Sequence, residues 1–179
     1  MRFFVTQSRL FVPVAVWALM LSSCATKSPR TEATLESNDE AVLPAPTGYV
    51  TDFPKVLTAD ETAALERTLS SLDKTGRAQI IVYITGALGE HVLEDITLRS
   101  ANAWGIGEHG KDNGLVIFLF MKERRIRIEV GLGLEKIISD EFAKRIIEEN
   151  MVPAFRKSQF GEGLSSAADR IIKRLSEEL

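Results

Sequence analysis

The segment Gly114–Met121 (GLVIFLFM) constrains the fold most, because every residue after its first glycine is apolar. Such a run predicts a β-strand covered on both faces, since a strand with one exposed face alternates polar and apolar residues. A short polar turn around Lys122–Arg124 follows. The segment Arg125–Val130 then alternates strictly, with its aliphatic residues inward and Arg125, Arg127 and Glu129 on a solvated outward side. That pattern predicts a β-hairpin whose second strand lies nearer a sheet edge.

The flanking segments supply helices for both sides of this sheet. Thr58 and Glu61 form a capping box, which predicts a helix over residues 59–74, and the apolar, β-branched run Ala78–Thr85 predicts another buried strand. Further helices are expected over residues 91–103, after the capping residue Ser139, and from about residue 164 to 175. The order α-β-α-β-β-α-α predicts an α/β fold, a three-layer αβα sandwich on a small mixed sheet containing the hairpin.

The N-terminus has the features of an export signal. Arg2 and Arg9 precede or flank the apolar run Leu10–Leu21, which is shorter than the roughly 20 apolar residues that span a bilayer. The run ends on Leu21-Ser22-Ser23-Cys24, which resembles a bacterial lipobox. We therefore expect residues 1–23 to be removed and the chain's single cysteine, Cys24, to carry the lipid that attaches the protein to a membrane. The alternative is an ordinary secretory signal with an incidental cysteine.

Composition divides the mature chain into a tether and a domain. Residues 25–47 are rich in Ser, Thr, Glu, Ala and Pro, which predicts a disordered tether behind Cys24, followed by a folded domain over residues 48–179. Without Arg2 and Arg9, 20 basic residues stand against 25 acidic ones. This net charge of −5, without basic clusters, argues against nucleic-acid partners and against electrostatic binding to anionic lipid. Ala25 after the cysteine favours the periplasmic face of the outer membrane, if the host has two membranes.

Acidic and glycine residues gather at the open end of the predicted hairpin. Asp112, Asn113 and Gly114 enter the first strand, and Gly131-Leu132-Gly133-Leu134-Glu135 leaves the second. A turn at Glu123–Arg124 places Asp112 opposite Glu135, and a slip of a couple of residues still leaves the two segments side by side. Asp140 begins its helix from the same end.

The side chains expected there are oxygen donors. Carboxylates of Asp112, Glu135 and Asp140, with the amide of Asn113, suit Ca²⁺ or Mg²⁺ rather than zinc or copper. The competing interpretation is turn chemistry, because Asp-Asn-Gly forms turns and Ser139-Asp140 caps a helix. The sequence contains no Gly-x-Ser-x-Gly elbow, phosphate-binding loop or Cys/His cluster, and the glycines after the hairpin are a poor dinucleotide signal, so no nucleotide cofactor is expected.

Taken together, the spaced motifs from Val50 to about Leu175 resemble the TPM-domain family. The matching segments are Val50-Thr51-Asp52, AQIIVYIT, AWGIG, KDNGL, RIRIEVGLGLE, Ser139-Asp140, MVPAFR and FGEGL. The resemblance implies a Rossmann-like αβα sandwich, divalent-cation binding by acidic loop residues, and the acid phosphatase activity of some members. It carries over Asp52, which rests on the family motif alone, together with Asp112, Asn113, Glu135 and Asp140. Two departures are Leu132, where the family usually has tyrosine, and the absence of the transmembrane segment and Gly-rich tail of many relatives.

Three functions are consistent with these residues. The first is a Ca²⁺- or Mg²⁺-binding lipoprotein domain that assists assembly, repair or maintenance of envelope proteins through a protein partner. The second is a metal-assisted acid phosphatase, with Asp112 as the candidate nucleophile or base. The third is a structural interaction domain in which the acidic residues only stabilise turns.

Overall fold

The computed structural model describes residues 41–178. The predicted signal peptide, the lipidation site Cys24 and the tether up to residue 40 lie outside the described residues, as does Leu179.

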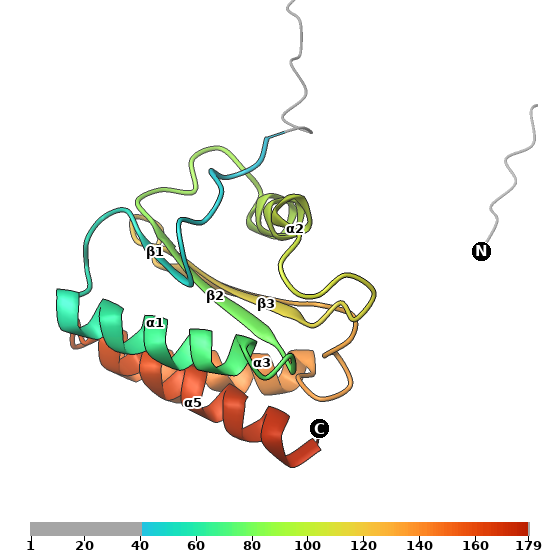
Figure 1. Ribbon diagram of the computed structural model, residues 1–179. Coiled ribbons are helices and arrows are strands. Elements are labelled where there is room, and N and C mark those ends of the chain that lie inside the picture. Colours follow the sequence, from blue (N-terminus) through green and yellow to red (C-terminus); the bar gives the residue numbers. More distant parts are fainter. Residues whose placement is uncertain (1–40, 179) are drawn as a thin grey trace, which may run out of the picture. The chain divides into compact units, whose positions relative to one another are not determined.

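A four-stranded mixed sheet organises the described chain (Figure 1). Its strands, in spatial order, are β1 (Val50–Asp52), β2 (Gln79–Thr85), β3 (Gly114–Phe120) and β4 (Arg125–Val130). The first three run parallel, and β4 returns antiparallel to β3 as the predicted hairpin. The three-residue strand β1 was not predicted, because so short a segment shows no periodicity.

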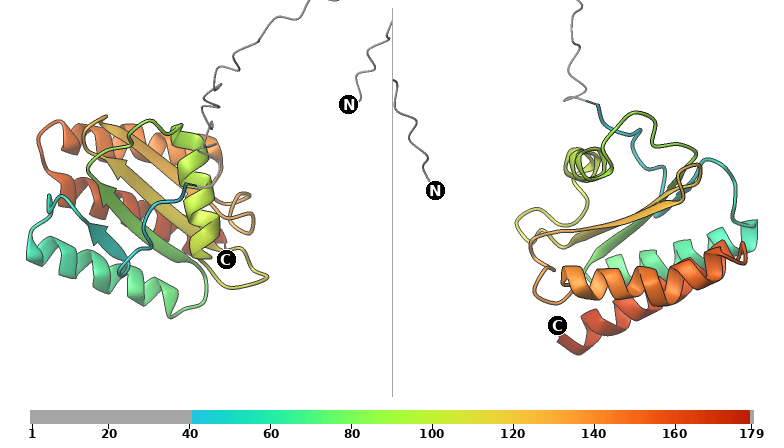
Figure 2. Two further views of the ribbon diagram at one scale, coloured as in Figure 1. Left: turned by 90° about the horizontal axis from the view of Figure 1, so that it is seen from above. Right: turned by 180° about the vertical axis from the view of Figure 1, so that it is seen from behind.

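Helices cover both faces of the sheet. The helical elements are α1 (Ala59–Asp73), α2 (Leu93–Trp104), α3 (Asp140–Ile146), the π-helical turn η2 (Ile147–Met151), α4 (Val152–Phe155) and α5 (Phe160–Glu178). Helix α2 lies on one face, and α1, α3 and α5 lie on the other (Figures 1 and 2). The predicted three-layer α/β sandwich is confirmed. The predicted capping box is also present, because the side chain of Thr58 and that of Glu61 each bond the other's backbone N–H.

Strand β3 explains why the sheet must be covered twice. Leu115, Ile117 and Leu119 belong to the core beneath α1 and α5, while Val116, Phe118 and Phe120 belong to a second core beneath α2. All six side chains are at most 2% exposed. Burying apolar side chains on both faces stabilises the fold by about 1.5–3 kcal/mol each, which fixes β3 as an inner strand.

The core beneath α2 is smaller and is built on aromatic rings. Trp104 packs on Tyr83 and Phe118, with ring centroids 4.8 and 5.6 Å away, so it is part of this core. Its indole Nε1 donates a hydrogen bond to the carbonyl oxygen of Leu43. The Trp104 ring is therefore held by packing on Tyr83 and Phe118 and by the hydrogen bond from its Nε1 to Leu43.

Residues 41–47, which composition assigns to the tether, lie against this aromatic core. The Leu43 amide donates to Ser100 Oγ at 2.9 Å, and the Tyr83 hydroxyl donates to the carbonyl oxygen of Pro44 at 3.0 Å. Ala41 also packs against the core beneath α2. These bonds satisfy backbone groups that would otherwise need water, so the segment belongs to the domain.

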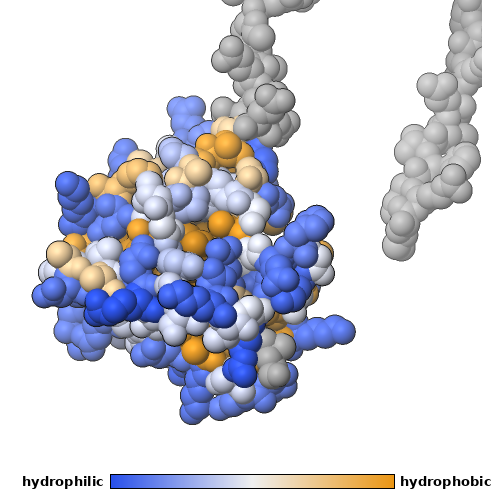
Figure 3. Space-filling view, viewed as in Figure 1, coloured by the Kyte–Doolittle hydropathy of each residue, from blue (hydrophilic) through white to orange (hydrophobic). Residues whose placement is uncertain are grey.

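The surface shown in Figure 3 is mostly hydrophilic, with apolar side chains in small patches between the layers. Among residues 41–178, no helix combines the length and the apolar character that crossing a bilayer requires.

Candidate functional site at the open end of the hairpin

The hairpin register brings the two predicted segments together. Leu115 pairs with Val130, the Gly131 amide donates to Gly114 O at 2.8 Å, and the Gly133 amide donates to Asp112 O at 3.0 Å. Asp112 thus faces Gly133 and not Glu135, a shift of two residues from the predicted pairing. The expectation that the entry to β3 and the exit from β4 lie side by side is confirmed.

Glycine is required here because backbone meets backbone. A Cβ atom on Gly133 would overlap the carbonyl oxygen of Lys111, and one on Gly131 would overlap that of Asp112. A Cβ on Gly114 would likewise overlap the carbonyl of Ile106, in the loop after α2. The α2–β3 loop and the loop after β4 are therefore packed through their main chains, which leaves this end of the sheet little freedom to move.

Asn113 joins these loops and does not enter the groove. Its side chain is 6% exposed, its Oδ1 accepts from the Glu108 amide at 2.7 Å, and its Nδ2 donates to the carbonyls of Gly76 and Arg77. The amide oxygen predicted as a metal ligand is already an acceptor for a backbone N–H. Its role in this structure is to connect the α1–β2 turn to the loop before β3.

A groove of about 650 Å³ opens beside this packed backbone, between α2, β4 and the start of α3. Three predicted carboxylates, those of Asp112, Glu135 and Asp140, line it, together with Glu108 and His109. The side chains of the first three are exposed and have no hydrogen bond or ion pair within residues 41–178. Asp112 has φ +49°, a left-handed conformation that aspartate tolerates better than most residues.

The groove also contains an ion pair that the sequence pattern did not predict. Arg127 Nε donates to Glu129 Oε1 at 2.9 Å, and Thr97 of α2 donates its hydroxyl to the same oxygen at 2.7 Å. The hydrogen bond that Arg127 donates to Glu129 raises the pKa of the Arg127 guanidinium, burial lowers it, and the charges of Glu129, Glu94 and Asp140 raise it further.

Of the three side chains predicted on the solvated side of β4, Arg125 is exposed at 54%, but Arg127 and Glu129 depart from the prediction. The outward side of β4 is the side that α2 covers, so both residues are partly buried, and the Glu129 side chain is only 11% exposed. A helix was expected in this layer. If that helix had been considered together with the alternation of β4, Arg127 and Glu129 would have been predicted to lie beneath it.

Asp52 lies at the opposite end of the sheet from the groove. It pairs with Ile84 near the carboxyl end of β2, whereas Asp112 precedes the amino end of β3, which runs parallel. Its Oδ2 accepts from the Leu57 amide at 2.8 Å, and its Oδ1 is buried without a partner among the described residues. The structure brings Asp112, Glu135 and Asp140 to one groove and keeps Asp52 apart from them.

The groove carboxylates are spread around its rim. Within residues 41–178, no three side chains of His, Cys, Asp or Glu come close enough together to form a metal-binding group. The donor chemistry nevertheless suits a hard cation, because unpaired carboxylate oxygens face the groove while its backbone is fixed.

Comparison with known proteins gives the same fold and a family. The family model for the TPM domain matches residues 50–174. The N-terminal domain of a protein from P. gingivalis, determined by solution NMR, is 32% identical with a TM-score of 0.68, over 74% of this chain and 85% of that one. That domain was studied apart from the rest of its protein, so a region of this kind folds alone. The comparison with curated proteins gives no match.

Two further solved structures share the fold at lower identity. The BA42 protein from the psychrophilic bacterium Bizionia argentinensis is 18% identical with a TM-score of 0.61, over 70% of this chain and 86% of that one. The N-terminal domain of the cg2496 protein from Corynebacterium glutamicum is 16% identical with a TM-score of 0.58, over 79% and 91%. Since the family model spans β1 to α5 and a relative of 32% identity covers the same region, this chain belongs to the TPM-domain family.

Proposed function

We propose that the chain is an envelope lipoprotein whose TPM domain binds a divalent cation in the groove at the open end of the hairpin. The observation that carries the proposal is the set of three unpaired carboxylates, on Asp112, Glu135 and Asp140, around one groove with a glycine-packed backbone. The negative charges around the rim attract a cation into the groove. Their exposed side chains can rotate toward a bound ion without moving the main chain.

The cation would be Ca²⁺ or Mg²⁺. Asp112, Glu135 and Asp140 would hold it, and waters or backbone carbonyls would complete a shell of oxygen ligands. Asn113 would support the site from behind, through the three hydrogen bonds of its side chain. Asp52 would take no part, because it lies at the other end of the sheet.

Membrane attachment through Cys24 fits this module. The 17 peptide units between Cys24 and residue 41 would reach roughly 60 Å when extended, so an anchored domain could meet a partner well away from the bilayer. We place it on the periplasmic face of the outer membrane in a host with two membranes, where it would assist an envelope protein. Incorporation of labelled palmitate into wild type but not into Cys24→Ser would support the anchor, and incorporation into both would contradict it.

A metal-assisted phosphomonoesterase is the second candidate, and Arg127 is the observation that favours it. Its guanidinium lines the groove, and Glu129 and Thr97 fix its orientation through one shared carboxylate oxygen. A guanidinium held in this way can bind two phosphate oxygens. A bound cation would supply charge neutralisation on the phosphoryl group, and Asp112 lines the same groove as the candidate nucleophile or base.

The cation proposal is tested by thermal melts of the mature chain titrated with Ca²⁺ and with Mg²⁺. Saturation at about 100 times the dissociation constant should stabilise wild type by roughly 2.7 kcal/mol. Asp112→Asn removes the charge and keeps a residue that tolerates the left-handed conformation, so it should fold and lose most of the shift. Asp169→Asn, an exposed carboxylate of α5, should keep the full shift.

The outcomes of this titration are distinct. Equal stabilisation of both variants would place the cation elsewhere, and no stabilisation of wild type would reject the cation site. Hydrolysis of phosphate esters that is lost in Arg127→Ala, while the cation shift remains, would make the phosphatase the better description.

A further inference from the structure

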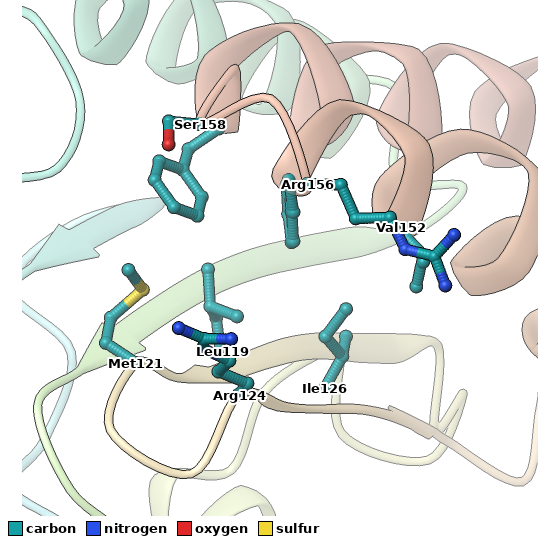
Figure 4. A pocket seen from close by; sticks show the side chains of 9 residues that line it. Leu119, Met121, Arg124, Ile126, Val152, Arg156 and Ser158 are labelled. Carbon is teal, nitrogen blue, oxygen red and sulfur yellow. The ribbon is translucent and has the colours of Figure 1, made fainter.

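A second cavity lies at the opposite end of the hairpin, and it belongs to no part of the groove described above. It encloses about 600 Å³ between the hairpin tip and the segment that joins α4 to α5. Figure 4 shows residues of the hairpin, among them Arg124 and Ile126, facing Val152, Arg156 and Ser158 across it. Its size is in the range of cavities that bind small molecules, roughly 300–1,000 Å³.

The walls of this cavity are apolar. Leu119, Met121 and Ile126 contribute from the hairpin, and Val152, Phe155 and Phe160 contribute from the helical side. The lining includes no acidic residue. An apolar cavity of this kind favours a hydrocarbon group, since each buried methylene gains about 0.8 kcal/mol on leaving water.

Two arginines and a serine are the polar members of the lining. Arg124 comes from the hairpin tip, where its guanidinium lies over Leu119, and Arg156 follows the end of α4, where its guanidinium lies beside Val152 (Figure 4). Neither guanidinium has an ion pair or hydrogen bond within residues 41–178, whereas Arg170 and Arg174 on α5 are paired with glutamates at 2.9 and 3.0 Å. Two unpaired positive charges facing one apolar cavity complement a ligand with an anionic head and a hydrocarbon tail.

Two residues that line the cavity have an uncommon backbone conformation. Arg124 and Ser158 both have left-handed conformations, with φ of +53° and +60°, although neither is glycine or asparagine. At Arg124 this conformation belongs to the turn between β3 and β4, and at Ser158 it belongs to the turn that ends α4, where the amides of Ser158 and Gln159 donate to the carbonyls of Phe155 and Ala154.

We propose that this cavity binds a single-chain anionic lipid, with its acyl chain on the apolar walls and its carboxylate or phosphate attracted by the exposed side chains of Arg124 and Arg156. The hairpin and the α4–α5 segment each provide apolar side chains and one arginine. This lining suits a slender ligand that carries one charged end. A free inorganic anion would leave the apolar walls uncovered, and a neutral hydrocarbon would leave both charges unpaired.

The test is a titration of ¹⁵N-labelled Ser37–Leu179, the compact unit that contains the whole cavity. Octanoate, decanoate and dodecanoate are added below their micelle concentrations, with decanol, acetate and inorganic phosphate as comparisons. Amide signals of Leu119–Ile126 and Val152–Phe160 should shift with the fatty acids. Affinity should rise about fourfold for each added methylene until the cavity is filled.

Charge-removing variants separate this site from non-specific binding. Arg124→Gln and Arg156→Gln should each weaken decanoate binding by about tenfold, and the matched control Arg67→Gln on α1 should leave it unchanged. Both positions are exposed, so the variants should fold as wild type does, which the unshifted remainder of the spectrum would verify.

Several results would overturn the proposal. Decanol that binds as tightly as decanoate would remove the role of the arginines, and phosphate that binds as tightly would remove the role of the apolar walls. A peptide with an apolar C-terminal residue that binds more tightly than dodecanoate would make the occupant a protein terminus. Because the titration uses neither metal nor the lipid anchor, its failure would leave the proposed cation site and anchoring unaffected.

Discussion

The two ends of the β3–β4 hairpin are built in different ways. At the open end, glycines let the α2–β3 loop and the loop after β4 pack main chain against main chain, and the exposed side chains are mostly carboxylates. At the tip, side chains from the hairpin and from the α4–α5 segment enclose an apolar cavity with two arginines. One end is a rigid frame that carries negative charge, and the other is a cavity that carries positive charge.

Because the two ends are built differently, substitutions at one end should have different consequences from substitutions at the other. A frame made of backbone contacts depends on the absence of side chains, so substitutions there alter the fold. A cavity made of side chains depends on their shapes and charges, so substitutions there alter the ligand. The following predictions test this contrast, from the largest expected effect to the smallest.

Gly133→Ala should give the largest loss of stability. The added methyl group would overlap the Lys111 carbonyl, a backbone atom that cannot rotate away. We expect a loss of about 3 kcal/mol in the free energy of unfolding, measured by urea denaturation. The matched control is Gly86→Ala, where a Cβ meets no atom within 4 Å. Similar small losses for both variants would show that the open end is not a rigid frame.

Asn113→Ala tests the same frame from inside. It removes three side-chain hydrogen bonds and leaves the Glu108 amide and two carbonyls to find other partners. The expected cost is about 2 kcal/mol by urea denaturation, because buried polar groups lose their partners. Asn102→Ala, at an exposed position on α2, should cost less than about 0.5 kcal/mol. If the two variants lose equal stability, Asn113 does not connect the loops in solution.

Much of the open end could be predicted from the sequence, and the tip cavity could not. Asp112 and Glu135 stand in short motifs next to strands whose antiparallel pairing follows from the turn between them. Arg124 and Arg156 are 32 positions apart in the sequence, and they line one cavity only because the α4–α5 segment packs against the hairpin. The net negative charge of the mature chain gave no sign that two arginines line one cavity, because they form no basic cluster in the sequence.

Two other features depended on contacts that leave no periodic signal. Strand β1 is too short to alternate, so the position of Asp52 at the far end of the sheet was not apparent. The segment at residues 41–47 has a disordered composition, yet side chains of α2 and β2 hold it: the Leu43 amide donates to Ser100, and Trp104 and Tyr83 donate to the carbonyls of Leu43 and Pro44. Its order comes from tertiary contacts and not from its own sequence.

Tyr83 provides a pH test of that segment and of the face that carries the groove. Burial raises the pKa of its hydroxyl to about 12, while the unfolded chain should titrate near 10. The folded state retains the proton longer, so this contribution to stability is complete below pH 10 and is lost as pH rises from 10 toward 12. The loss should reach roughly 2 kcal/mol near pH 12.

Tyr83→Phe supplies the control for that test. It removes the titrating group and the bond to Pro44, so it should cost about 1 kcal/mol at pH 7 and should flatten the decline above pH 10. Urea denaturation at several pH values measures both effects. An alkaline decline as steep in the variant as in wild type would mean that Tyr83 is accessible to water, and that residues 41–47 do not cover the core beneath α2.

The smallest expected change in stability comes from replacing Arg124 or Asp112 by glycine. Each is a charged residue with a left-handed backbone conformation, Arg124 at the tip of the hairpin and Asp112 at its open end. Glycine relieves left-handed strain of about 1–2 kcal/mol at a long side chain, and its greater freedom in the unfolded chain costs about 0.5–1 kcal/mol. Arg124→Gly should therefore stabilise the protein by about 0.5 kcal/mol. Asp112→Gly should change stability little, because aspartate tolerates this conformation.

Paired with binding measurements, these two variants separate structure from function. Arg124→Gly should lose decanoate binding while its midpoint in urea rises, and Asp112→Gly should lose the cation-dependent shift while its midpoint stays constant. Loss of stability in Arg124→Gly would mean that the arginine is part of the fold and not a residue kept for a ligand. In that case the tip, like the open end, would be a structural frame, and the contrast between the two ends would not hold.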